Sequence, residues 1–180
     1  YITLIIIAIV NLFLIQLAPE AVAIFAPKEY YEAIWVIPPI AMSVYFMYSY
    51  DLFAKFAFYY EKTKFVMIAS VMGAGLNILL NYICIKQFGY MAAGYTTLVC
   101  YIFYATAHYI FMRKVCRDCC DGEYPYETKT ILMITIPFII LGFALMSTYY
   151  YPIIRYGIVA IAFVTTIIMR KRITRILKTI

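Results

Sequence analysis

Charged residues are scarce in this sequence. Asp, Glu, Lys and Arg make up 13% of its 180 residues, whereas 66% of the residues are hydrophobic. A soluble domain of this length needs far more polar side chains to cover its surface. The few charges also cluster between apolar runs of about 20 residues, which is the length of helix that crosses a bilayer. The composition therefore excludes a soluble globular domain and predicts an all-α integral membrane protein.

Enzymatic signatures are also lacking. The sequence contains no glycine-rich phosphate loop, no H-E-x-x-H, no G-x-S-x-G and no carboxylate cluster. We therefore expect no enzymatic activity and no cofactor. A net charge of +6 would suggest nucleic acid in a soluble protein. In a membrane protein the placement of the cations matters more, so no nucleic-acid partner is expected.

The start of the chain has neither a methionine nor the features of a signal peptide. It begins with Tyr1 and is apolar from the second residue, without a charged n-region or a small-residue cleavage site. We therefore expect this chain to be a fragment, with part of the protein preceding it.

Six transmembrane helices are predicted from the apolar runs and the polar segments between them. The spans cover residues 2–17, 37–60, 65–85, 90–112, 130–149 and 153–169. Residues 21–36 carry charges, so they are expected to form an interfacial loop with a short amphipathic helix over residues 28–36. Pro38 and Pro39 are tolerable in the first turn of a helix, because the N–H groups there have no helical partner.

The basic residues are divided unequally between the two sides on which the loops of six alternating spans lie. Lys55 falls inside a span, and one side receives only Lys28, Lys86 and Arg155. The other side receives eleven: Lys62, Lys64, Arg113, Lys114, Arg117, Lys129, Arg170, Lys171, Arg172, Arg175 and Lys178. This asymmetry predicts that the second side, with both chain ends, is cytoplasmic. The basic tail, residues 170–180, can bind anionic membrane lipids there.

The second span carries a polar stripe. Tyr48, Asp51, Lys55 and Tyr59 recur at a spacing of three and four and so share one helix face. An Asp or Lys at the centre of a membrane helix is unfavourable by about 2.5–3.5 kcal/mol, so each needs a partner or water. Two interpretations follow. The stripe lines a substrate cavity, or Lys55 extends to the interface while Asp51 neutralises it.

The next two spans carry further polar stripes, Ser70, Gly73, Asn77 and Asn81 on one and Ala93, Thr97, Cys100, Tyr104 and His108 on the other. An amide side chain in hydrocarbon is unfavourable by roughly 2–7 kcal/mol, so both asparagines are expected to face protein or a wet cavity. They could form interhelical hydrogen bonds or line a cavity. For His108 we expect a packed histidine with satisfied hydrogen bonds, with a proton relay as the alternative.

Three cysteines in the polar segment 113–129 suggest a metal site at first sight. Cys116, Cys119 and Cys120 form C-x-x-C-C beside Asp118 and Asp121. Thiolates at this spacing suit zinc, but the second half of a four-ligand site is lacking. We expect free thiols and no metal, because cytoplasmic cysteines stay reduced. Cys84 and Cys100 are expected to pack within the membrane.

Residues 25–113 resemble a known family. The segment FAPKEYYEAIWVIPP is followed by E-K-T-K and then by GLNILLNYICIKQFGYMAAGYTTL, of which N-x-x-x-N, F-G and A-A-G are the most specific parts. This order resembles the C-terminal half of the Wzx-like polysaccharide-export flippases. These are polysaccharide biosynthesis proteins of the multidrug/oligosaccharidyl-lipid/polysaccharide transporter superfamily.

The resemblance implies a transporter of two helical bundles that alternates between inward-open and outward-open states. The substrate would be a polyprenyl-diphosphate-linked oligosaccharide in the cytoplasmic membrane. This chain would form most of one bundle, and a missing N-terminal bundle would supply the other wall of the cavity. The candidate substrate-binding residues are Tyr48, Asp51, Lys55, Tyr59, Asn77 and Asn81.

Three other functions remain open. In an ion-coupled multidrug exporter of the same superfamily, Asp51 is the one intramembrane acid available to bind the coupling ion, whereas a lipid diphosphate would need Lys55. A non-transporting membrane scaffold subunit and a membrane enzyme acting on polyprenyl lipids are the remaining alternatives.

Overall fold

The computed structural model describes residues 1–120 and 122–177, with side chains for all of these except residues 163 and 166–177. Within these ranges the chain is all helical. Its elements are α1 (Ile2–Gln16), α2 (Ala18–Phe25), η1 (Lys28–Trp35), α3 (Ile37–Tyr59), α4 (Thr63–Phe88), α5 (Ala92–Cys119), α6 (Thr128–Ser147), η2 (Thr148–Tyr150) and α7 (Pro152–Leu177), where η marks a 3-10 helix.

The helices follow the predicted spans closely, with three differences. Helix α7 continues to Leu177 instead of ending near residue 169. Residues 18–25, of which 21–25 belong to the predicted loop, form helix α2, and α5 continues to Cys119 instead of ending near residue 112. The extension of α5 is explained by packing, because Met112 and Cys116 are fully buried in a cluster with Phe53. The predicted basic tail, residues 170–180, lies outside the residues whose side chains are described.

Two to four helices are long and apolar enough to cross a membrane, so the six predicted spans are not confirmed. The two are α4 and the continuous segment Thr128–Tyr150. The number rises to four if the pair α1 and α2, bent by 59°, and the pair η1 and α3, bent by 50°, each form one span. Helix α5 is not among them because tyrosines, threonines and His108 interrupt its apolar residues, and the described apolar part of α7, Pro152–Ala162, is short.

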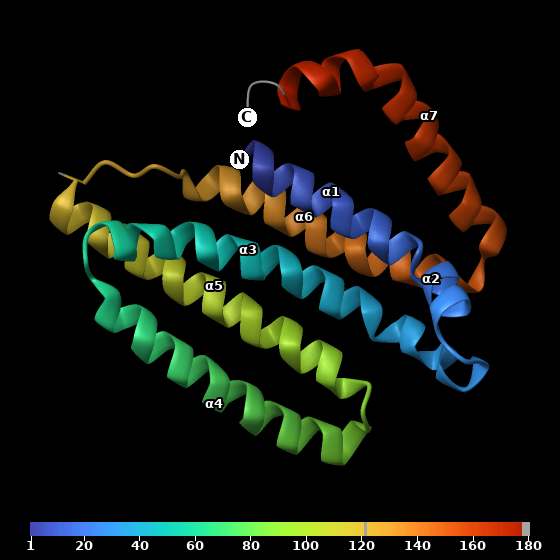
Figure 1. Cartoon of the computed structure of the whole chain (residues 1–180), viewed down its shortest axis with the longest axis horizontal. Coiled ribbons are helices and arrows are strands. Elements are labelled where there is room, and N and C mark those ends of the chain that lie inside the picture. The colour runs from blue at the N-terminus through green and yellow to red at the C-terminus, as the bar shows by residue number, and fades with distance from the viewer. Residues whose placement is uncertain (121, 178–180) are drawn as a thin grey trace.

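The helices α4, α5 and α3 lie side by side in that order (Figure 1). α1 and α6 cover the other side of α3, and α7 leaves the bundle at the edge far from α4. Helix α4 packs mainly on α5, and Ala69 is the only residue within it that is buried. Its exposed face carries Met67, Ile68, Val71, Met72, Ile78 and Leu79. A continuous apolar face of this size marks contact with lipid or another protein rather than water.

The main core lies between α1, α3 and α6. Tyr45 of α3 is 1% exposed, and its ring centroid lies 4.4 Å from that of Phe138 in α6. The Tyr45 hydroxyl also shares a hydrogen bond of 2.9 Å with Thr135 Oγ1. Buried Leu4 and Ile15 complete the core from α1. This core holds α3 rigidly, and α3 in turn supports α5.

The two ends of the bundle differ in charge. At one end, called here the basic end, the backbone N–H of Glu127 donates to the Tyr1 hydroxyl, and the Tyr60 hydroxyl lies 3.0 Å from Cys120 Sγ. The segment between α3 and α4 and the segment between α5 and α6 both lie at this end. Its described cations are Lys62, Lys64, Arg113, Lys114, Arg117 and Lys129. The opposite end, formed by α2, η1, η2 and the turn between α4 and α5, has Lys28, Lys86 and Arg155.

Candidate functional site

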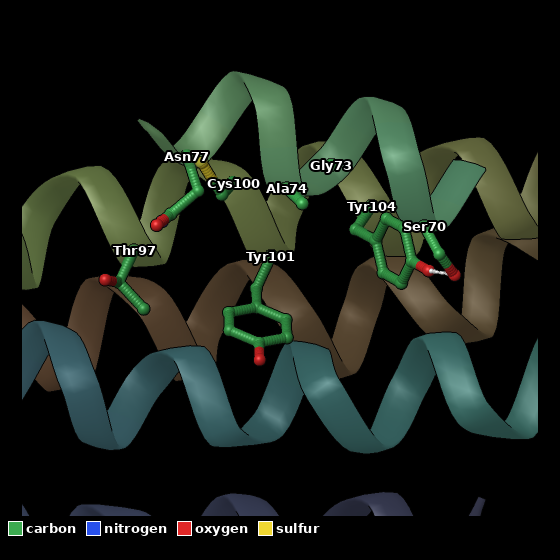
Figure 2. Close-up of a pocket in the computed structure, with 8 residues that line it drawn as sticks. All are labelled: Ser70, Gly73, Ala74, Asn77, Thr97, Cys100, Tyr101 and Tyr104. Atoms are coloured by element: carbon green, nitrogen blue, oxygen red, sulfur yellow. Dashed lines mark hydrogen bonds between the residues drawn. The ribbon is translucent and has the colours of Figure 1, made fainter. Parts of the chain in front are cut away.

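A pocket of about 330 Å³ lies between α4 and α5 (Figure 2). We call it the polar pocket. Four residues come from each helix: Ser70, Gly73, Ala74 and Asn77 from α4, and Thr97, Cys100, Tyr101 and Tyr104 from α5. The pocket thus presents two hydroxyls, an amide and two tyrosine rings within a pair of otherwise apolar helices.

The polar pocket is formed by two stripes that the sequence predicts. Ser70, Gly73 and Asn77 recur every three or four residues on α4, and Thr97, Cys100 and Tyr104 do so on α5. Such residues lie one above the other on a single helix face. The two faces meet because Gly73 leaves room for the Tyr104 ring, which would lie 3.1 Å from a Cβ atom at this glycine.

Hydrogen bonds join α4 to α5 at both sides of the polar pocket. The Ser70 hydroxyl shares a hydrogen bond of 2.7 Å with the Tyr104 hydroxyl, drawn in Figure 2, and also donates to the carbonyl of Val66. Near the opposite end, Asn81 Nδ2 donates to Asn77 Oδ1 at 3.0 Å, and the Thr96 hydroxyl donates to Asn81 Oδ1. Asn81 therefore forms the expected interhelical hydrogen bond, whereas Asn77 accepts from Asn81 and lines the pocket.

The stripe on α3 lies elsewhere. Tyr48 and Asp51 line a groove of about 590 Å³ between α1 and α3, beside buried Asn11. Lys55 Nζ lies 3.5 Å from Asp51 Oδ2, and the two side chains are 63% and 58% exposed. Tyr59 is 80% exposed at the basic end. The ion pair was one of the two predicted interpretations, and the groove gives Asp51 access to a cavity as well.

The six candidate residues therefore do not form one site. Helix α5 lies between α3 and α4, so the groove with Tyr48 and Asp51 is separated from the polar pocket with Asn77. Aromatic rings of α3 and α5 lie between the groove and the polar pocket. Tyr50, which also lines the groove, has its ring centroid 4.5 Å from Tyr104 and 6.3 Å from Tyr101, both of which line the pocket.

A buried ion pair at the opposite end was not predicted. Arg155 was predicted near the start of the sixth span and does lie in the first turn of α7, but its burial and its partner were not predicted: it is 6% exposed and donates from its guanidinium to Glu20 Oε1. The Tyr156 hydroxyl also donates to this carboxylate at 2.7 Å, and Gln16 Nε2 donates to the Arg155 carbonyl at 3.0 Å. The cluster ties α1 and α2 to α7. No periodicity links Glu20 with Arg155, so the sequence pattern offered no signal for it.

The cysteines at the basic end are free thiols. Burial raises the pKa of the Cys116 thiol to about 11, and a hydrogen bond with Cys120 raises the pKa of Tyr60 to about 12. Among the described residues no group of three or more His, Cys, Asp or Glu could hold a metal ion. Asp121 lies outside the described residues.

The fold and the site define the class of this protein. The described chain is an all-helical bundle with two to four helices suited to crossing a membrane, and it carries a polar, tyrosine-lined pocket between two of its helices. No family model, curated protein or solved structure matches the chain.

Proposed function

We propose that this chain is part of a flippase that moves a polyprenyl-diphosphate-linked oligosaccharide across the cytoplasmic membrane for cell-surface polysaccharide export. The observation that carries the proposal is the polar pocket, which lies in the stretch of α4 and α5 that resembles the polysaccharide-export flippases. The chain itself forms most of one bundle, and a second bundle supplies the other wall of the translocation path.

The chemistry of the polar pocket suits a sugar. Sugar hydroxyls need hydrogen-bond donors and acceptors, which Ser70, Asn77 and Thr97 offer. Sugar rings also present apolar C–H faces that can lie against aromatic rings, and Tyr101 and Tyr104 supply these. No charged residue lines this pocket, so it is suited to the neutral part of a glycan rather than to the diphosphate.

The proposed membrane arrangement has six spans, formed by α1 and α3 to α7. Two features support it. Helix α4 exposes an apolar face along its length. The described cations also gather at the basic end, which we place in the cytoplasm together with the C-terminus. The helices then alternate in direction, and the turn between α4 and α5 lies on the outer side. Alternating access would move the two bundles relative to each other around the glycan.

A matched pair of threonine variants tests the glycan site. Thr97 in the polar pocket and exposed Thr106 outside it each donate to the carbonyl four residues earlier, so Thr→Val removes the same local hydrogen bond at both positions. If Thr97 also binds the glycan, Thr97→Val should slow flipping about two- to tenfold, the effect of one lost hydrogen bond. Thr106→Val should leave the rate unchanged.

The measurement uses the full-length protein in liposomes that contain a fluorescent polyprenyl-diphosphate oligosaccharide. The rate at which label becomes protected from a membrane-impermeant quencher reports flipping. Equal rates for Thr97→Val and Thr106→Val would exclude the pocket from glycan binding. No flipping by any form, with normal folding, would instead favour a non-transporting scaffold subunit.

An ion-coupled multidrug exporter is the second candidate. It is favoured by the position of Asp51, whose carboxylate lines the groove between α1 and α3 together with Asn11. In such an exporter Asp51→Asn should abolish export driven by an ion gradient, because the neutral amide cannot bind the coupling cation. In the flippase, Lys55→Met should impair transport more than Asp51→Asn, since Lys55 is the cation available to the diphosphate. Measuring Asp51→Asn and Lys55→Met in the flipping assay and in an assay of export driven by an ion gradient separates the two functions.

A further inference from the structure

His108 is buried without a hydrogen bond at either ring nitrogen. It is 1% exposed, and neither Nδ1 nor Nε2 has a partner. Nearly all buried polar groups in proteins are hydrogen-bonded. The sequence predicts a packed histidine with satisfied hydrogen bonds. The packing is confirmed, but the hydrogen bonds are absent, so packing alone does not account for an imidazole at this position.

The neighbours of His108 are aromatic. Its ring centroid lies 4.7 Å from that of Tyr104 and 5.4 Å from those of Tyr50 and Phe65. The titratable groups whose rings face it are Tyr50 from α3 and Tyr104 from its own helix, and α4 contributes the Phe65 ring. Among the described residues no carboxylate or cation forms an ion pair or hydrogen bond with His108.

A protonated His108 does not fit this closed site. The imidazolium has two N–H donors and a full charge, and in this closed arrangement neither ring nitrogen has a hydrogen-bond partner. Water would satisfy both donors if it could reach the ring. Protonation of His108 therefore favours any arrangement of the helices that lets water in.

Helix α4 is the wall best suited to move. It packs mainly on α5, whereas α3 is held by the core. It is bounded by two tight turns, with Glu61 at φ 57° and Gly89 at φ 78°. Phe65 of α4 contacts His108, and Ser70 of α4 binds Tyr104 at the polar pocket. Moving α4 away from α5 would therefore expose His108 and widen the polar pocket together.

We infer that His108 is a proton-binding site, and that its protonation separates α4 from α5 and opens the polar pocket. The inference concerns the geometry of the helices and does not depend on which substrate enters the pocket. Proton binding at this histidine would couple pH, or a proton gradient, to the opening of the polar pocket between α4 and α5.

Two measurements on the protein in lipid nanodiscs test this inference. In the full-length protein labelled with ¹³C-histidine, the imidazole signal that is lost in His108→Phe is assigned to His108, and its titration is followed between about pH 4 and pH 8. Opening is followed by alkylation of Cys100, which lines the polar pocket and is 7% exposed. The rate is divided by that of exposed Cys119, because lowering the pH reduces the thiolate fraction of both cysteines.

We expect the ratio of Cys100 to Cys119 alkylation to rise about fivefold or more as the pH falls, with the same midpoint as the imidazole signal. In His108→Phe, which keeps a ring but binds no proton, the ratio should stay constant. A constant ratio in the natural sequence, an equal rise in His108→Phe, or an imidazole that does not titrate would each overturn the inference. If His108→Phe does not fold, the natural sequence still tests the inference: the alkylation ratio and the imidazole signal must change with the same pH midpoint, and different midpoints would overturn it.

Discussion

Replacing Glu20 by alanine should lower the free energy of unfolding by about 3–5 kcal/mol, because it leaves the Arg155 guanidinium buried without its carboxylate. The Arg155 side chain is 7% exposed, so water cannot replace the lost partner without disturbing α7. The change is measured by denaturant titration of the purified protein in detergent micelles, with helix content followed by circular dichroism.

An exposed ion pair provides the control. Arg117 and Asp118 at the basic end are paired at 3.5 Å with side chains 66% and 51% exposed. Asp118→Ala should therefore change the free energy of unfolding by no more than about 1 kcal/mol. A second variant, Glu20→Ala with Arg155→Met, removes both charges and should recover most of the loss, since no buried charge is left unpaired. Equal effects of Glu20→Ala and Asp118→Ala would contradict a buried, stabilising pair.

The helices themselves were predictable because their signals are local. Runs of apolar residues set their length, and Pro38, Pro39, Gly89 and Pro152 lie near helix ends in the structure as they do in the predicted pattern. The exception was residues 18–25, because the first span was expected to end before Pro19 and Glu20 and a loop was expected from residue 21 onward. Both residues suit the first turn of a helix, because proline needs no N–H partner there and an acidic side chain interacts favourably with the helix dipole.

The polar pocket was predictable in part. Spacing along the chain places Ser70 and Asn77 on one face of their helix and Thr97 and Tyr104 on one face of the next, and the short turn between α4 and α5 makes the two helices neighbours. Spacing does not reveal which helix lies beside α3. Because α5 occupies that position, Asp51 and Asn77 lie at different sites although both belong to predicted polar stripes.

Interactions between distant parts of the chain were not predictable from periodicity. Glu20 and Arg155 are 135 residues apart, and no periodicity in the sequence connects them. The sequence also identifies His108 as the single histidine but does not say whether its nitrogens find partners. In both cases the deciding quantity is burial within the bundle, and burial depends on how α7 and α4 are placed against the other helices.

Gly94→Ala should destabilise the protein by about 1–3 kcal/mol, because the added methyl group overpacks the contact between α5 and the start of α3. A Cβ at residue 94 would lie 2.9 Å from Val36 Cγ1 and 3.0 Å from the Val36 carbonyl oxygen. The side chain can rotate away, but the carbonyl belongs to the backbone that begins α3 and accepts a hydrogen bond from Ile40. Relief of the clash therefore requires α5 to shift away from α3.

Gly75→Ala is the matched control, and it should have the opposite sign. Gly75 lies inside α4, and a Cβ there would have no neighbour within 4 Å. Alanine loses less conformational entropy than glycine when a helix forms, so this variant should gain about 0.5–1 kcal/mol. The same denaturant titration measures both changes. If Gly94→Ala were as stable as Gly75→Ala, α5 would not be held tightly against α3. The polar pocket would then lack the fixed wall against which a movement of α4 could open it.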